Sequence, residues 1–175
     1  MTPLMHTTSV PVFKQMLGGL SGVLAKAEAH AEAKKIEPSV LLQARLFPNM
    51  FALLQQVQVA CDFAVTVSAR LAGVAVPTFD RTDGPDGPDS SFADLHARIA
   101  KVLAFMDGLP AQSFEGSAAR EIVLRPGTPK EKRLLGQAYL SNYGLPQFFF
   151  HVTTAYAILR HHGVEVGKKD YMGAY

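Results

Sequence analysis

The sequence predicts an all-α protein, namely a four-helix bundle with crossover connections and a small β-hairpin before the last helix. Four long segments carry apolar residues at the three- and four-residue spacing of helices, and two of them are apolar on most sides. Packing four such helices around a common core buries these faces. The connections after the second and third helices are long enough to permit crossovers. At 175 residues, the chain is expected to form a single domain, residues 1–175.

The first long helix is predicted over residues 10–35, and Pro38 stops it. Three glycines interrupt its first half at Gly18, Gly19 and Gly22. They either permit the close approach of another helix or only weaken the helix propensity, and both interpretations stay open. The apolar positions of this segment have helical spacing and comprise Val12, Phe13, Met16, Leu17, Leu20, Val23, Leu24 and Ala27.

The second helix is expected from Pro48, which suits a first helical turn, to about Leu71. It is apolar on most sides and should lie centrally in the core. Its polar exceptions are Gln55, Gln58 and Asp62, and their spacing of three and four places them on one face.

Residues 78–91 are rich in Asp, Gly and Pro and are predicted to form a loop. Ser91 and Asp94 resemble a capping box, with Asp in place of the usual Glu, and should start a third helix that ends near Asp107. Residues 120–125 and 130–135 then flank a Pro-Gly-Thr-Pro turn, which predicts a hairpin.

A short helix is expected over residues 136–143, and the last long helix runs from about Pro146 to His162. Gly163 is placed at the position just past the end of this helix, where a left-handed residue is common. The last helix is almost wholly apolar and buries one histidine, His151.

Composition argues against several classes of function. The net charge is only +2 and no basic stripe is present, so we expect no nucleic-acid partner. The longest apolar run, Phe148 to Leu159, is too short to span a bilayer, and the N-terminal residues do not resemble a signal peptide. We therefore expect a cytoplasmic protein with no membrane partner. The one cysteine, Cys61, lies in an apolar run and is expected to pack in the core.

Three segments carry a family resemblance: LFPNMF at 46–51, QVACDF at 58–63, and FFHVTTAYAILR at 149–160 followed by GVEVGK at 163–168. They resemble an uncharacterised bacterial family related to the DinB/YfiT-like proteins. The resemblance covers nearly the whole chain and implies a DinB-like four-helix bundle, often dimeric. Many members of that superfamily hold a divalent metal with three histidines, one on the second helix and two in a His-x-x-x-His pair on the last. Some of those members are thiol-dependent transferases.

The sequence departs from this metal pattern. His151 matches the first histidine of the last-helix pair, but Ala155 stands at the second position, and the second helix has no histidine. At most one of the three expected ligands is therefore present, whereas a stable catalytic zinc site needs three protein ligands. We expect no bound metal, with a zinc or nickel ion held by His151 as the alternative.

His151 is the strongest candidate for chemistry, either as a general base or metal ligand in a pocket between the second and last helices, or as a core histidine held by one hydrogen bond. Asp62 is its natural partner and would orient the imidazole, although an ion pair with Arg160 is an equal alternative. The further candidates for ligand binding are Gln55, Gln58, Tyr156 and Arg160.

Two functions follow from these observations. The first is a homodimeric module with a degenerate metal site that binds a small ligand or serves a structural role, the aromatic run Phe148–Phe150 and the aromatic tail fitting a buried dimer face. The alternative is a metal-dependent hydrolase or thiol-dependent transferase that uses a pocket around His151 and Asp62.

Overall fold

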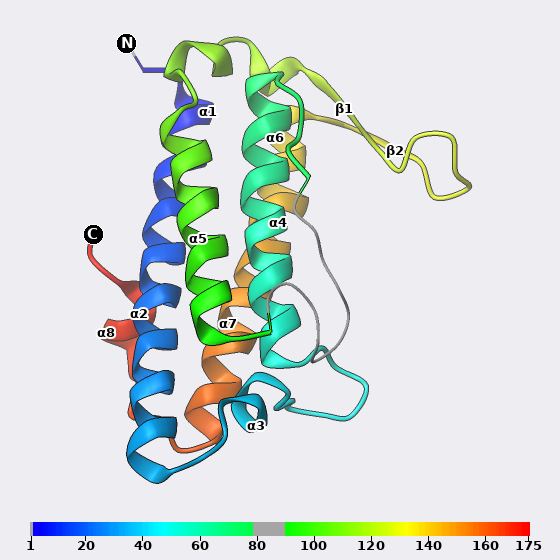
Figure 1. The fold of residues 1–175 in the computed structure, drawn as a ribbon. Helices are drawn as coiled ribbons and strands as arrows, with labels where there is room; N and C mark the ends of the chain where they lie inside the picture. Colours follow the sequence, from blue (N-terminus) through cyan, green and yellow to red (C-terminus); the bar gives the residue numbers. More distant parts are fainter. Residues whose placement is uncertain (1, 79–89) are drawn as a thin grey trace.

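The computed structural model describes residues 2–78 and 90–175 and confirms the predicted bundle (Figure 1). Its core is a continuous cluster of buried apolar side chains contributed mainly by the four long helices. Phe13 and Phe148, for example, meet edge to face at 4.8 Å between ring centroids in this core. The long helices are α2 (Val10–Lys34), α4 (Leu53–Ala72), α5 (Phe92–Asp107) and α7 (Leu145–His161).

The helices follow the predicted crossover topology. Helices α4 and α5 run in the same direction, whereas α2 and α7 run in the opposite direction (Figure 1). The end of α4 and the start of α5 therefore lie at opposite ends of the bundle, and most of the predicted 78–91 loop lies outside the described residues. None of the helices in the described parts of the chain is both long enough and apolar enough to cross a membrane.

The packing around α2 explains why a glycine is needed at Gly19. A Cβ atom on Gly19 would lie 2.7 Å from the carbonyl oxygen of Tyr171, in the short helix α8 (Lys168–Met172). Around Gly18 and Gly22, by contrast, the space is open. Gly19 therefore permits close packing of α8 on α2, and the other two glycines only lower the helix propensity. Two further short helices, α1 (Leu4–Thr7) and α3 (Pro38–Leu42), flank α2.

Helix α4 begins at Leu53, and the predicted start at Pro48 is wrong. The Leu53 N–H donates to the Ala44 carbonyl at 2.9 Å, and Arg45 donates to the Met50 carbonyl at 2.8 Å. These bonds close the intervening chain into a turn, so Pro48 lies outside the helix. As a consequence, Phe51 is held at the start of α4 with 48% of its surface exposed.

The other helix boundaries agree with the sequence. Ser91 and Asp94 form the predicted capping box of α5, with backbone-to-side-chain distances of 3.1 and 3.0 Å. Gly163 has a φ of 85° and follows the last residues of α7, as predicted. Its neighbour Val164 donates to the Leu159 carbonyl and closes the helix end.

The connection between α5 and α7 stays at one end of the bundle (Figure 1). It contains two 3₁₀ turns, η1 (Ala111–Phe114) and η2 (Ser117–Ala119), and then the predicted hairpin. Strands β1 (Glu121–Leu124) and β2 (Lys132–Leu135) pair antiparallel, with Glu121 opposite Leu135.

After β2 the chain forms one continuous helical rod. The rod starts as α6 (Gly136–Tyr139), passes through a π-helical turn, η3 (Leu140–Gly144), and continues as α7. The sequence predicts a short helix over 136–143 but does not reveal the π turn. Gly136 is required at the start, because a Cβ there would lie 1.9 Å from the Ser117 carbonyl oxygen.

Candidate functional site

His151 is buried in the interface of α4 and α7, with 7% of its surface exposed. Its Nδ1 donates to Oε1 of Gln56 at 2.7 Å. The imidazole lies nearly parallel to two phenyl rings, that of Phe63 at 5.8 Å and that of Phe51 at 6.4 Å. The Gln56 amide also donates to the Phe51 carbonyl at 3.1 Å. An amide and aromatic rings therefore surround the histidine that the sequence singled out.

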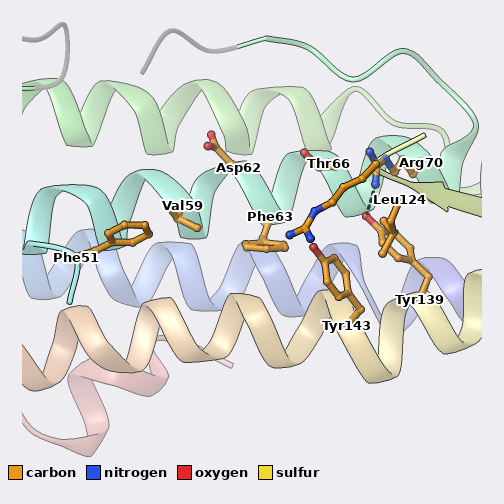
Figure 2. Close-up of a pocket in the computed structure, with 10 residues that line it drawn as sticks. Phe51, Val59, Asp62, Phe63, Thr66, Arg70, Leu124, Tyr139 and Tyr143 are labelled. Carbon is orange, nitrogen blue, oxygen red and sulfur yellow. Dashed lines mark hydrogen bonds between the residues drawn. The ribbon is translucent and has the colours of Figure 1, made fainter. Parts of the chain in front are cut away.

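Asp62 lies on the side of α4 that faces α5 (Figure 2). There it forms an ion pair with Arg98 of α5, at 2.8 Å between Oδ1 and Nη2. The Arg98 side chain is only 3% exposed, so this carboxylate compensates a buried positive charge. The sequence proposed His151 or Arg160 as the partner of Asp62, and the structure provides Arg98. An ion pair between two bundle helices accounts for a carboxylate on an otherwise apolar helix.

The remaining predicted residues are dispersed. Gln58 is buried on α4, and Gln55 is half-buried one turn before it. Tyr156 packs edge to face on Tyr171 of α8 at 5.6 Å, and Arg160 is exposed near the end of α7. Tyr156 and Arg160 therefore lie away from His151.

The residues around His151 do not fit the three-ligand metal site of the superfamily. Within residues 2–78 and 90–175, no group of three or more His, Cys, Asp or Glu side chains is close enough to hold a metal ion. Ala155, at the place of the second histidine, is fully buried. We therefore assign no chemistry through a metal to this histidine.

A cleft of about 380 Å³ runs along α4, on the side of α4 that also contacts His151. Figure 2 shows Phe63 and Tyr143 next to each other along it. These two rings meet edge to face at 5.9 Å, and Tyr143 also stacks on Tyr139 at 5.8 Å. The cleft is lined by Phe51, Val59, Asp62, Phe63, Thr66, Arg70, Leu124, Arg125, Tyr139 and Tyr143.

The hairpin is held against α4 by Arg120, which lies just before β1. The Arg120 guanidinium donates to the carbonyl oxygens of Arg70 and Leu71, at the end of α4. It can approach because Gly73 has no side chain; a Cβ there would be 2.9 Å from Arg120 Nη1. This contact satisfies helix-end carbonyls and brings Leu124 and the residue after it to the cleft.

One tyrosine of the cleft, Tyr139, has a shifted pKa. Burial raises the pKa of Tyr139, and the nearby Arg70 guanidinium offsets part of that rise. Arg70 donates to the Tyr139 hydroxyl at 3.5 Å and lies 5.9 Å above its ring. At neutral pH Tyr139 is therefore a neutral phenol that holds Arg70 at the cleft wall.

Part of this site can be recognised in the sequence. Gln56 is a polar residue on a buried helix, which predicts a hydrogen-bonded partner, but the three- and four-residue spacing to Asp62 points to Gln55 and Gln58 instead. Tyr139 and Tyr143 stand four apart, as stacked helical neighbours do. No sequence pattern indicates that the hairpin residue Arg125 reaches the same cleft.

Comparison with known proteins supports the resemblance noted in the sequence. Residues 5–172 match the family model described as "Domain of unknown function (DUF1993)". The chain belongs to this family. Among curated proteins, none matches the chain significantly.

The DUF1993 chain is also similar to a solved structure, the crystal structure of a DinB family member protein from Shewanella denitrificans. The two chains are 40% identical, and the TM-score is 0.89. The match covers 98% of this chain and 93% of the other. The DUF1993 protein is therefore a DinB-like bundle, as the resemblance predicts.

Proposed function

We propose that this DUF1993 protein binds a small, partly aromatic organic molecule in the cleft along α4. The observation that carries the proposal is the cleft wall, where the partly exposed rings of Phe63 and Tyr143 meet and the buried Tyr139 ring stacks behind Tyr143. The volume of the cleft, about 380 Å³, is within the range of small-molecule sites, roughly 300–1,000 Å³. Aromatic side chains provide apolar area, while hydroxyl and guanidinium groups at the same wall fix orientation.

In this proposal His151 supports the site instead of reacting. It packs against Phe51 and Phe63, which both line the cleft, and its bond to Gln56 fixes the ring between them. Replacement of His151 is therefore expected to make Phe51 and Phe63, which form the floor of the cleft, more mobile. The donor set around His151 favours this role over the metal-dependent hydrolase or thiol-dependent transferase suggested by the superfamily.

Filling the cleft tests the proposal. Thr66 lines the cleft, so Thr66→Trp should occupy part of its volume, whereas Ala104→Trp places the same side chain on the exposed face of α5. Ligand-detected NMR with indole, 2-naphthol and 2-naphthamide should show binding to the wild-type protein and to Ala104→Trp, and weaker binding to Thr66→Trp. Equal binding to both variants, or no binding to the wild type, would refute the proposal.

We also propose that the protein is a homodimer. Two exposed aromatic residues support this, since Phe51 and Phe150 are 48% and 54% exposed and both contact the His151 ring. Phe148, which the sequence places in a dimer face, is fully buried in the core. The candidate dimer face therefore excludes Phe148 and is centred on Phe51 and Phe150. Light scattering coupled to gel filtration should give twice the chain mass, and Phe150→Glu should reduce it. A monomer at all concentrations would contradict the proposal.

A further inference from the structure

The charges of the cleft are unbalanced within the described residues. Asp62 is compensated by Arg98 at 2.8 Å. Arg70 and Arg125 also line the cleft, and neither forms an ion pair in the part of the chain that the structure describes. The Arg70 guanidinium contacts a neutral phenol, Tyr139. The cleft therefore carries an excess of positive charge beside its aromatic wall.

The backbone of Arg125 is held in a turn directly after β1, and the residue is exposed. It follows β1 with a φ of 50°, in the left-handed region that residues other than glycine rarely adopt. The backbone N–H and the side-chain hydroxyl of Thr128 both donate to the Arg125 carbonyl, at 3.3 and 2.9 Å. Such backbone strain persists where the surrounding structure enforces it, and it is concentrated at binding sites.

The basic character extends beyond the cleft. A second hollow, also of about 380 Å³, shares Leu124, Arg125 and Tyr143 with the cleft. Lys130 and Lys132 line this second hollow. Arg125 therefore stands where an aromatic cleft meets a basic surface, and an anion bound there would have cations on more than one side.

We propose that the ligand of the cleft is an aromatic anion, a planar ring that carries a carboxylate or phosphate group, and that Arg125 is the residue that selects the anion. The ring would pack against Phe63 and Tyr143, and the anionic group would accept hydrogen bonds from the guanidinium of Arg125, with Arg70 as the second cation. Guanidinium groups match the planar oxygen pairs of carboxylates and phosphates. This inference rests on the proposed function and adds the substrate class to it.

The test compares matched ligands on matched variants. The ligands are 2-naphthoate, 2-naphthyl phosphate and the neutral 2-naphthamide, and their dissociation constants are measured by calorimetry or NMR titration. The variants are Arg125→Gln and Arg133→Gln, which each remove one positive charge from the hairpin. Arg133 is exposed, pairs with Glu121 and Glu131, and does not line the cleft, so it controls for general attraction of anions.

We expect the wild type to bind at least one of the two anions about tenfold or more tightly than the amide, which is the discrimination of one charged hydrogen-bonding group. This preference should fall towards parity in Arg125→Gln, with affinity for the amide unchanged, and should persist in Arg133→Gln. The anion that shows the larger preference distinguishes a carboxylate from a phosphate ligand.

The outcomes separate the two proposals. Equal binding of anions and amide to the wild type would overturn the inference and leave the proposed small-molecule function intact. A preference that survives Arg125→Gln, or that disappears equally in Arg133→Gln, would overturn the assignment of Arg125. If no naphthalene ligand binds, neutral or charged, the proposed function itself fails. Circular dichroism melting of each variant confirms that loss of binding is not loss of fold.

Discussion

The hydrogen bond between His151 and Gln56 permits a quantitative test of whether the histidine is structural. Both side chains are buried, at 7% and 1% exposure, and their atoms Nδ1 and Oε1 are 2.7 Å apart. His151→Phe and Gln56→Met remove one partner each while nearly keeping the volume. Each single change leaves a buried polar group without this partner, and such a group costs about 1–3 kcal/mol.

The double variant removes both polar groups together. It should therefore be less destabilised than the sum of the single variants, by a coupling free energy of about 1–2 kcal/mol. Urea unfolding at pH 7.5, followed by circular dichroism, gives the four stabilities. Tyr156→Phe combined with Gln56→Met is the control pair, because Tyr156 packs on α8, and its effects should add within about 0.5 kcal/mol.

Additive effects of His151→Phe and Gln56→Met would refute a structural role for this hydrogen bond. The same conclusion would follow if His151→Phe abolished ligand binding and left stability unchanged, because the histidine would then contact the ligand instead of supporting the residues that line the cleft. The metal content of the wild-type protein, purified without chelator, is measured by elemental analysis alongside these unfolding experiments. A stoichiometric metal that is lost in His151→Ala would restore the metal hypothesis.

Two further predictions concern stability. Gly19→Ala should destabilise the protein by about 1–3 kcal/mol in urea unfolding, because its Cβ would meet backbone atoms of α8. Gly18→Ala lies in open space and should stabilise the protein by up to about 1 kcal/mol. Equal effects of the two changes would mean that α8 does not pack closely on α2. The raised pKa of Tyr139 stabilises the fold below the ordinary tyrosine pKa of about 10, and this contribution is lost as the pH rises through the higher folded value. Unfolding free energies from pH 8 to 11 should therefore fall more steeply for the wild type than for Tyr139→Phe, and parallel curves would contradict the assignment.

The bundle could be predicted because its signals are local. The apolar spacing of α2, the capping box at Ser91 and the position of Gly163 each depend on a few neighbouring residues, and the structure confirms them. The start of α4 could not be placed, because the turn before it is closed by Arg45 and by the distant Ala44–Leu53 hydrogen bond.

The site was harder to predict because its contacts join residues that are distant in the sequence. Helical spacing correctly indicates that His151 is buried and that Asp62 shares a face with Gln58, but it does not tell which neighbouring helix that face meets. In the structure Asp62 contacts Arg98 of α5, whereas Gln56 meets α7. The cleft joins residues from α4, the hairpin and the η3 turn, and their meeting depends on how the hairpin docks.

The π-helical turn η3 determines the rotational phase of the rod that carries both Tyr139 and His151. Twelve residues separate them, which in an uninterrupted α-helix, at about 100° per residue, would leave their side chains about 120° apart around the axis. A π turn accommodates about one residue more than an α turn, so the effective separation is close to eleven residues, or about 20°. Tyr139 can then contact Arg70, and His151 can contact Gln56, along the same face of α4. One extra residue in the backbone thus aligns the two ends of the site.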